Sequence, residues 1–310
     1  MDVLRPPRIS VITPVFNGEK YITETIISVL KYGKDYPIEY IVIDDGSTDA
    51  TAQILKSFHS SIKVIYQSNC GESAAVNTGI ANALGEFILV VSDDDPLFTS
   101  KIFEGVADFF DANQGVVAWY PDWNLIDGDG RPLETRSLPE FSDLLLIGQF
   151  NCLPGPGTFF RRAAAQEIHG RNPEYRFTGD YDFWLRLSRI GRIEHRNEVV
   201  AQWRMHPEST SIQSRGYAMA QERIRVMENF LKENEVEIPL MRSALGHAYY
   251  FAARLVIFDG SVDGKRYLLK AFKAQKGWIH HAKISIVVFI LCTPISSLAL
   301  RTIRKLWAPG

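Results

Sequence analysis

The chain has 310 residues, 46% of them hydrophobic, so it can fill a sizeable core and is not expected to be disordered. Its 34 Lys and Arg against 36 Asp and Glu give a formal net charge of -2. Because it also has no basic stripe interleaved with aromatic residues, we expect no nucleic-acid partner. The three cysteines include no CxxC pair, which argues against a disulfide framework or structural zinc and favours a reducing compartment.

In the first third, apolar runs alternate with helical patterns, which predicts βαβ units and a parallel sheet. The predicted strands are 9–15, 40–43, 62–66 and 87–91, and the predicted helices lie within 22–30, 50–58 and 74–83. Three of the strands end in polar loops, with the sequences TPVFN, DDGSTDAT and SDDDP. Since open α/β sheets bind ligands beyond the carboxyl ends of their strands, we expect these three loops to meet.

The middle of the chain is less regular. It contains a predicted strand at 116–120, the turn-rich sequence IDGDGRP and a predicted helix at 181–190. The Gly- and Pro-rich segment 153–162 is compatible with part of an acceptor site, or with a simple β-turn that leads into a helix. Amphipathic helices follow at 218–233 and 241–258, so we expect a domain boundary near residue 214.

Three consecutive carboxylates, Asp93, Asp94 and Asp95, follow the predicted strand 87–91. Such side chains repel one another unless a cation or strong hydrogen-bond donors neutralise them, which points to a metal site. The alternative is an exposed turn that caps the following helix.

Asp44 and Asp45 end a second predicted strand. Carboxylates at such a position can accept hydrogen bonds from a nucleobase or a ribose hydroxyl. The alternative is an N-cap motif for the next helix, which is the interpretation that we favour for residues 47–49.

A third acidic site contains Asp180 and Asp182, at the start of the predicted helix 181–190. An Asp there gains from the helix dipole, so a structural role is the simpler interpretation. A carboxylate that faces a metal-bound phosphate site could instead act as a general base.

Five segments carry a resemblance: SVITPVFNGEKYITETIISVL, YIVIDDGSTDAT, QSNCGESAAVNTGIANALGEFILVVSDDD, GDYDFWLRL and WRMHPES. In order and spacing they resemble the family 2 glycosyltransferases over about the first 210 residues. The resemblance implies the GT-A nucleotide-diphospho-sugar transferase fold, a Rossmann-like mixed α/β sheet flanked by helices, here with a helical C-terminal extension. It implies inverting transfer from a nucleotide sugar, usually a UDP-sugar with Mg²⁺ or Mn²⁺, to a hydroxyl of a saccharide or lipid-linked saccharide. Cell-surface polysaccharide or glycolipid synthesis is the implied setting.

The resemblance also assigns roles to individual residues. It implies that Asp180 is the general base and that Asp94, with Asp95 and His206, binds the metal. The residues that it implies for the nucleotide sugar are Pro14, Phe16, Glu19, Asp44, Asp45, Asn77, Gly79, Asp93 and Arg204.

Three positions depart from the family pattern. Ser92 replaces the first Asp of the Asp-X-Asp-Asp motif, and Gly179 replaces the Glu that precedes the base. Val76 stands where many members have an Arg, so a diphosphate contact is missing and other cations must balance the phosphates.

We expect three parts: a catalytic domain at 1–214, a helical extension at 215–276 and an apolar, basic tail at 277–310. The tail contains a run of seventeen residues without a charge, 284–300. As a helix this run would span only about 25 Å, against about 30 Å of hydrocarbon. We therefore favour peripheral or shallow attachment to a membrane, through the basic residues that follow, and packing in a helical core is the alternative. Because no signal peptide precedes the first strand, we expect a cytoplasmic protein at the inner face of the cell membrane.

Three other functions occur on α/β folds of this kind. A sugar nucleotidyltransferase needs a Gly-rich loop with a basic residue near the N-terminus, and FNGEKYI is a poor version of one. A dinucleotide-dependent oxidoreductase needs GxGxxG after the first strand, which is missing. A catalytically impaired sugar-nucleotide-binding protein would keep the fold and lose acidic residues, as at Ser92 and Gly179.

Overall fold

The computed structural model describes residues 6–209, 216–257 and 262–274. The chain divides into two compact units, the first formed by 1–142 and 152–209 and the second by 143–151 and 210–310. The predicted boundary at 214 lies outside the described residues, as do the predicted tail, 277–310, and its uncharged run.

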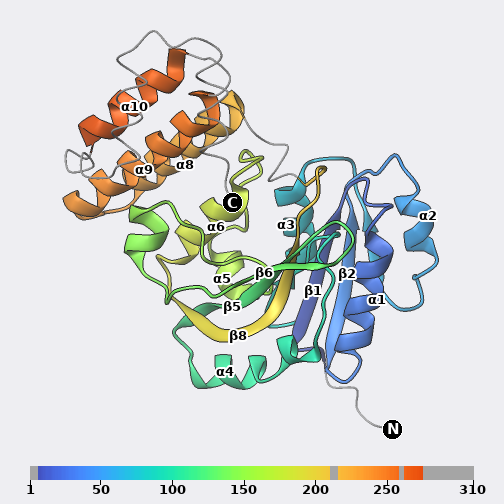
Figure 1. Ribbon diagram of the computed structural model, residues 1–310. Helices are drawn as coiled ribbons and strands as arrows, with labels where there is room; N and C mark the ends of the chain where they lie inside the picture. Colours follow the sequence, from blue (N-terminus) through green and yellow to red (C-terminus); the bar gives the residue numbers. More distant parts are fainter. Residues whose placement is uncertain (1–5, 210–215, 258–261, 275–310) are drawn as a thin grey trace. The chain divides into compact units, whose positions relative to one another are not determined.

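One mixed sheet of eight strands forms the first unit (Figure 1). Its order is β3-β2-β1-β4-β7-β5-β6, and β8 pairs with β5. The strands are β1 (Ile9–Val15), β2 (Ile38–Asp44), β3 (Lys63–Tyr66), β4 (Phe87–Val90), β5 (Val116–Ile126), β6 (Pro132–Arg136), β7 (Phe159–Arg161) and β8 (Arg192–Arg204). The first four run parallel, which confirms the predicted parallel pairing, whereas β7 runs antiparallel to β4.

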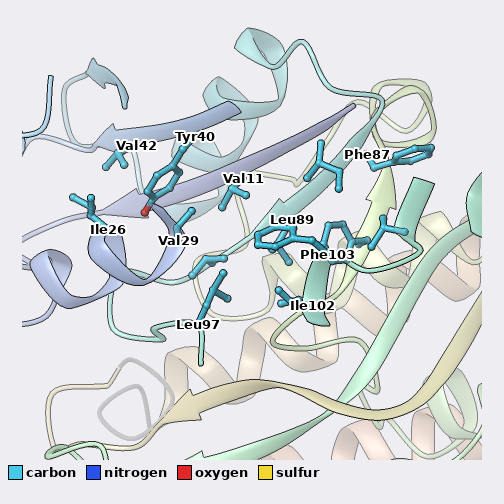
Figure 2. Packing of buried hydrophobic residues seen from close by; sticks show 14 of the residues in the cluster. Val11, Ile26, Val29, Tyr40, Val42, Phe87, Leu89, Leu97, Ile102 and Phe103 are labelled. Carbon is cyan, nitrogen blue, oxygen red and sulfur yellow. The ribbon is translucent and has the colours of Figure 1, made fainter. Parts of the chain in front are cut away.

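Helices cover both faces of the parallel strands. Successive side chains of a strand point to opposite faces, so a continuously apolar strand has apolar side chains on both faces that must be buried. On one face, Ile26 and Val29 of α1 belong to the same buried cluster as Val11 of β1 (Figure 2). On the other face, α3 approaches β1 so closely that a Cβ at Gly79 would lie 2.4 Å from Ile12 Cγ2. The helical elements of this unit are α1 (Ile22–Gly33), α2 (Thr51–Lys56), α3 (Glu72–Asn82), η1 (Ser100–Phe103), α4 (Val106–Ala112), α5 (Arg162–Glu167) and α6 (Gly179–Leu187).

The second half of the sheet was only partly predicted. β5 extends six residues beyond the predicted strand 116–120, forms a hairpin with β6 and pairs in parallel with β8. The sequence of β8, RIEHRNEVVAQWR, does not alternate apolar and polar residues, so it was not predicted as a strand. Its burial does not alternate either, and its pairing with β5 contains several register shifts. This strand matters for function, since it ends at Arg204.

Helices form the described part of the second unit: η2 (Leu144–Gly148), α8 (Tyr217–Glu233), α9 (Ile238–Ile257) and α10 (Val262–Ala274). α9 packs against both α8 and α10. Ser243 in α9 donates a hydrogen bond to Gly148 O at 2.7 Å, which joins the segment 143–151 to the helices. No helix in the described ranges is both long enough and apolar enough to cross a membrane.

Candidate active site

Hydrogen bonds join the two loops that follow β1 and β2. The hydrogen bonds run from Asn17 N to Ser47 Oγ, Gly18 N to Thr51 Oγ1, Glu19 N to Asp49 Oδ2, Thr48 N to Asn17 Oδ1 and Ala50 N to Glu19 Oε2, all between 2.7 and 3.1 Å. The carboxylate of Glu19, predicted to lie at the nucleoside, therefore holds the neighbouring loop. Pro14 is buried within β1, whereas Phe16 is 49% exposed and presents a ring on which a base could stack.

Asp44 and Asp45 are both buried, and both accept hydrogen bonds from the protein. Asp44 Oδ1 accepts from Ser47 N at 2.9 Å. The carboxylate of Asp45 accepts three hydrogen bonds, from Gln67 Nε2 and the backbone N–H groups of residues 70 and 71, at 2.7 to 2.9 Å. Since a carboxylate offers about four acceptor sites, Asp45 mainly orders the loop before α3.

Asn77 and Gly79, both in α3, make close contacts with neighbouring elements. The side chain of Asn77 donates to Arg171 O at 2.7 Å and accepts from Arg171 N at 2.8 Å, so its amide clamps a loop to α3. Gly170 adopts φ +70°, and a Cβ there would lie 2.3 Å from Asn77 Oδ1. Both predicted residues thus act through packing in this structure.

The acidic triplet lies in a turn held from two sides. Thr25 Oγ1 in α1 donates to Asp93 O at 2.8 Å, and Gln202 Nε2 in β8 donates to Pro96 O at 2.5 Å. The next helical element, η1, is capped instead by Thr99, whose hydroxyl accepts from the backbone N–H of residue 101. The alternative that the triplet caps this element is therefore wrong.

The three carboxylates of the triplet have different surroundings. Burial and the neighbouring Asp94 raise the pKa of both Asp93 and Asp95 well above the ordinary value. Asp93 packs beneath Gly18, where a Cβ would lie 2.2 Å from Asp93 Oδ2. Asp95 Oδ1 accepts from Arg204 N at 2.7 Å. The Asp94 side chain is 20% exposed and contacts His206, a combination that neither Asp93 nor Asp95 has.

His206 lies against Asp94. Its Nε2 is 2.9 Å from Asp94 Oδ2, and because an ionised carboxylate only accepts, the imidazole donates. The His206 ring also packs on Tyr21 of the loop before α1, with ring centroids 4.7 Å apart. The imidazole is thus held against the exposed carboxylate.

Arg204, at the end of β8, is only 1% exposed, and protein acceptors surround its guanidinium. Nε donates to Asp94 O at 2.8 Å, Nη1 to Gly128 O at 3.0 Å and Nη2 to Glu24 Oε2 at 2.7 Å. The guanidinium also lies over the Tyr21 ring, 4.9 Å from its centroid. We predicted that Arg204 contacts the nucleotide sugar, but these contacts make it a positioning residue that holds α1, β8 and the acidic turn together.

Replacing Arg204 with methionine is expected to lower the free energy of unfolding by about 2–4 kcal/mol, because two half-buried carbonyls and Glu24 lose their donor. Chemical denaturation measures this loss. Glu24→Gln is the milder control, expected to cost less than about 1 kcal/mol, because Glu24 is 55% exposed. If Arg204→Met kept full stability and lost only donor binding, Arg204 would instead be a direct ligand.

Asp180 and Asp182 lie in the first turn of α6 and differ in exposure. Asp180 is exposed, and its Oδ1 accepts from Tyr181 N at 2.7 Å. Asp182 is buried and forms an ion pair with Arg186 at 2.6 Å. Gly179 packs on α3, where a Cβ would lie 2.2 Å from Ser73 Oγ, so an acidic side chain at this position would require Ser73 to move.

The Gly- and Pro-rich segment 153–162 contains a turn at 155–158, closed by a hydrogen bond from Thr158 N to Gly155 O at 3.2 Å. The turn leads into β7 before α5 begins, so it does not enter a helix directly.

A family model described as glycosyl transferase family 2 matches residues 10–168, just over half of the chain. This chain belongs to glycosyl transferase family 2. The match covers the loops after β1 and β2 and the acidic triplet.

Relatives of known name agree with this family. An uncharacterised glycosyltransferase of Rickettsia prowazekii is 31% identical over 212 residues, which cover 66% of each chain. Chondroitin synthase of Escherichia coli is 29% identical over 212 residues, which cover 67% of this chain and 30% of that protein. The chain spans less than two thirds of the length of the first three relatives, between 66% and 41%.

Solved structures show the same fold. TarS of S. aureus in complex with UDP-GlcNAc aligns with a TM-score of 0.56 at 20% identity, over 86% of this chain and 89% of that one. The mannosyltransferase PcManGT of Pyrobaculum calidifontis, in complex with GDP-Man and Mn²⁺, aligns with a TM-score of 0.57 at 14% identity, over 98% and 88%. The expected GT-A fold, with its mixed sheet flanked by helices, is confirmed.

Enzymes with the GT-A fold commonly use a divalent metal ion. Within the described residues, no group of three or more His, Cys, Asp and Glu side chains could hold one. Asp94 and His206 are the residues that would hold such an ion, since a carboxylate oxygen and an imidazole nitrogen are both metal-ligand types and Asp94 Oδ2 lies 2.9 Å from His206 Nε2. His206 would have to give up its Nε2 proton. Asp95 does not fit, because it is buried and bound to Arg204 N.

Several residues that build this site were not identified from the sequence. Glu24 and Thr25 lie on α1 and show no signal beyond helical periodicity. Gly18 and Tyr21 lie within the first segment that resembles the family, but neither residue was singled out. The role of Gly18 could not be recognised from the sequence, because it depends on the close approach of the Gly18 backbone to Asp93 in the folded chain.

Proposed function

We propose that this chain is an inverting glycosyltransferase that moves a sugar from a nucleotide sugar, a UDP-sugar in the first instance, to a hydroxyl of a saccharide or lipid-linked saccharide. The observation that carries the proposal is the pair formed by Asp94 and His206, which α1, β8 and Arg204 hold beside the loops that follow β1 and β2. If this pair held a divalent ion, phosphate oxygens of the donor and water would supply the other ligands, as is usual for Mg²⁺ in phosphate sites.

The donor would lie along the carboxyl edge of the sheet, as ligands do in open α/β folds. In this arrangement Phe16 offers a face to the base, and the buried carboxylates of Asp44 and Asp45 keep the surrounding loops in place. Asp93 faces Gly18 with a raised pKa and is proposed to lie beside the ribose. Loops that are already ordered in this way would reduce the entropy lost when the donor binds.

The proposed reaction is a single in-line displacement. Asp180 accepts the proton of the attacking hydroxyl, and the bond from the anomeric carbon to the diphosphate breaks on the opposite side. When bound by Asp94 and His206, Mg²⁺ or Mn²⁺ supplies positive charge that stabilises the departing diphosphate. The exposure of Asp180 supports this role, because an acceptor that approaches from solvent can reach an exposed side chain.

The setting that we propose is cell-surface polysaccharide or glycolipid synthesis, at the inner face of the cell membrane. Support comes from the named relative, chondroitin synthase, and from the uncharged run 284–300 with the basic residues after it, which lies outside the described residues.

A panel of nucleotide sugars tests the function directly. In the presence of Mn²⁺, we expect one UDP-sugar at 100 times its Kd to stabilise the protein by about 2.7 kcal/mol, seen as a shift in thermal melting. We also expect slow, metal-dependent hydrolysis of that donor. The matched control is the same panel with a chelator in place of Mn²⁺, where the shift should disappear.

The outcomes separate the alternatives. A donor that binds with Mn²⁺ but is neither transferred nor hydrolysed would indicate the impaired binding protein. Formation of a nucleotide sugar from a nucleoside triphosphate and a sugar phosphate would indicate a nucleotidyltransferase. If no nucleotide sugar binds under any metal condition, the proposal fails.

A further inference from the structure

The outer face of α10 carries an unusual set of charges. Among the residues 262–274, four cations are exposed and the only acidic side chain is Asp263, in the first turn. The exposed cations are Lys265, Arg266, Lys270 and Lys273. Within the described ranges none of the four forms an ion pair, although Lys270 lies over the Tyr249 ring. By contrast, exposed arginines of the first unit, such as Arg131 and Arg192, are paired with carboxylates.

The cations share one side of the helix. At 100° per residue, the four cations fall within an arc of about 140° around the helix axis, with Lys265 and Lys270 at its two ends. Leu269 lies inside this arc, between Lys265 and Lys273, and is 56% exposed. The opposite side packs on α9 through Tyr267, Leu268 and Ala271. α10 is therefore anchored by its apolar face and presents a basic face with the exposed Leu269 within it.

The neighbouring helix α8 shows that this is a property of α10 and not of the whole unit. The exposed charges of α8 are two cations and two carboxylates: Arg225, Glu228, Lys232 and Glu233. A helix face that serves only to solvate the protein has no need to exclude carboxylates. The unbalanced face of α10 indicates a negatively charged partner.

We infer that the outer face of α10, defined by Lys265, Arg266, Leu269, Lys270 and Lys273, docks on an anionic lipid surface. This inference rests on the proposed function in one respect, since it specifies how the enzyme would contact the membrane. An anionic bilayer attracts each nearby Lys or Arg and also accepts an apolar side chain below its headgroups. An acidic polysaccharide would match the cations and offers nothing apolar for Leu269. The partner that fits both features is therefore the lipid surface.

Vesicle binding by the full chain tests the inference. The probe is a vesicle of phosphatidylcholine mixed with phosphatidylglycerol, compared with one of phosphatidylcholine alone. Each cation near such a surface contributes about fivefold to binding, so Lys265→Gln with Lys273→Gln should weaken binding about 25-fold. Glutamine keeps a good helix propensity, and circular dichroism checks the fold. Higher salt should reduce the difference between the two proteins.

A matched double variant, Lys232→Gln with Arg242→Gln, removes two exposed cations from α8 and α9 of the same unit and gives the same net charge. It should bind within about twofold of the unaltered chain. Equal losses in the two double variants would overturn the inference, because net charge and not the α10 face would then decide binding. Equal binding of the unaltered chain to both kinds of vesicle would also overturn it.

Leu269→Ser separates the lipid surface from a soluble polyanion. It should weaken vesicle binding several-fold and leave any binding to polyglucuronate unchanged. Binding of polyglucuronate that depends on the α10 cations, without vesicle binding, would replace the inference with an acidic polysaccharide partner. The donor panel run on the same variants keeps the two proposals apart. If donors bind but vesicles do not, only the docking surface fails; if vesicles bind but donors do not, only the transferase proposal fails.

Discussion

Asp180→Asn is expected to slow sugar transfer by about 100- to 10,000-fold while donor and metal bind nearly normally. The side chain is exposed at the first turn of α6, so the substitution removes a proton acceptor without disturbing packing. Single-turnover transfer kinetics measure the chemical step, and the thermal shift with Mn²⁺ and donor measures binding. We expect the transfer rate to fall while the thermal shift stays close to that of the unaltered chain.

Asp182→Asn is the matched control, two residues away in the same turn. Asp182 is buried, and the Arg186 that it binds also donates to the carbonyls of Ile168 and Gly170, so this ion pair holds α6 to the preceding loop. Its loss should lower the free energy of unfolding by about 1–3 kcal/mol, with a smaller effect on the chemical step. Near-normal turnover of Asp180→Asn together with an inactive, stably folded Asp182→Asn would reverse the two roles.

Asp94→Asn is expected to abolish the metal-dependent part of donor binding, a loss of at least about 100-fold, with the fold intact. Asp94 is the one carboxylate of the triplet that is both partly exposed and in contact with His206. The fold should persist because the backbone carbonyl of residue 94 still accepts from Arg204 in the variant. Titration of the UDP-sugar with and without Mn²⁺ measures the effect.

Asp95→Asn provides the control within the same triplet. Asp95 is buried and accepts from Arg204 N, so its substitution should change stability and leave the Mn²⁺ dependence of donor binding in place. His206→Gln should reproduce part of the Asp94→Asn defect, since the imidazole is the second proposed ligand. Metal dependence that survives in Asp94→Asn and disappears in Asp95→Asn would move the metal site by one residue.

The chain order and spacing of the first four strands were predictable from the sequence, because buried parallel strands form continuous apolar runs and the intervening helices have amphipathic periodicity. The position of the acidic triplet after one of these strands was predictable for the same reason. The polar residues of TPVFN, DDGSTDAT and SDDDP could be assigned to one edge of a sheet because parallel strands bring their carboxyl ends together.

The contacts of those residues were not predictable. Arg204 and Glu19 stand in motifs that suggest ligand contact, and the structure commits their charged groups to Glu24 and to the backbone of residue 50. Asp45 is similarly bound to the loop before α3. Local sequence shows which groups are polar, but their hydrogen-bond partners lie 22 to 180 residues away along the chain.

By itself, the sequence determined the α/β class, the family and the three loops that carry polar residues, because these depend on local periodicity and on motifs with fixed spacing. Only the tertiary structure decided the surroundings of each carboxylate of the triplet. Asp93 lies against Gly18, Asp95 is buried and accepts from Arg204 N, and Asp94 is partly exposed and contacts His206. The physical reason is that burial and pairing of a charge are set by elements distant in sequence, here the loop before α1 and the end of β8.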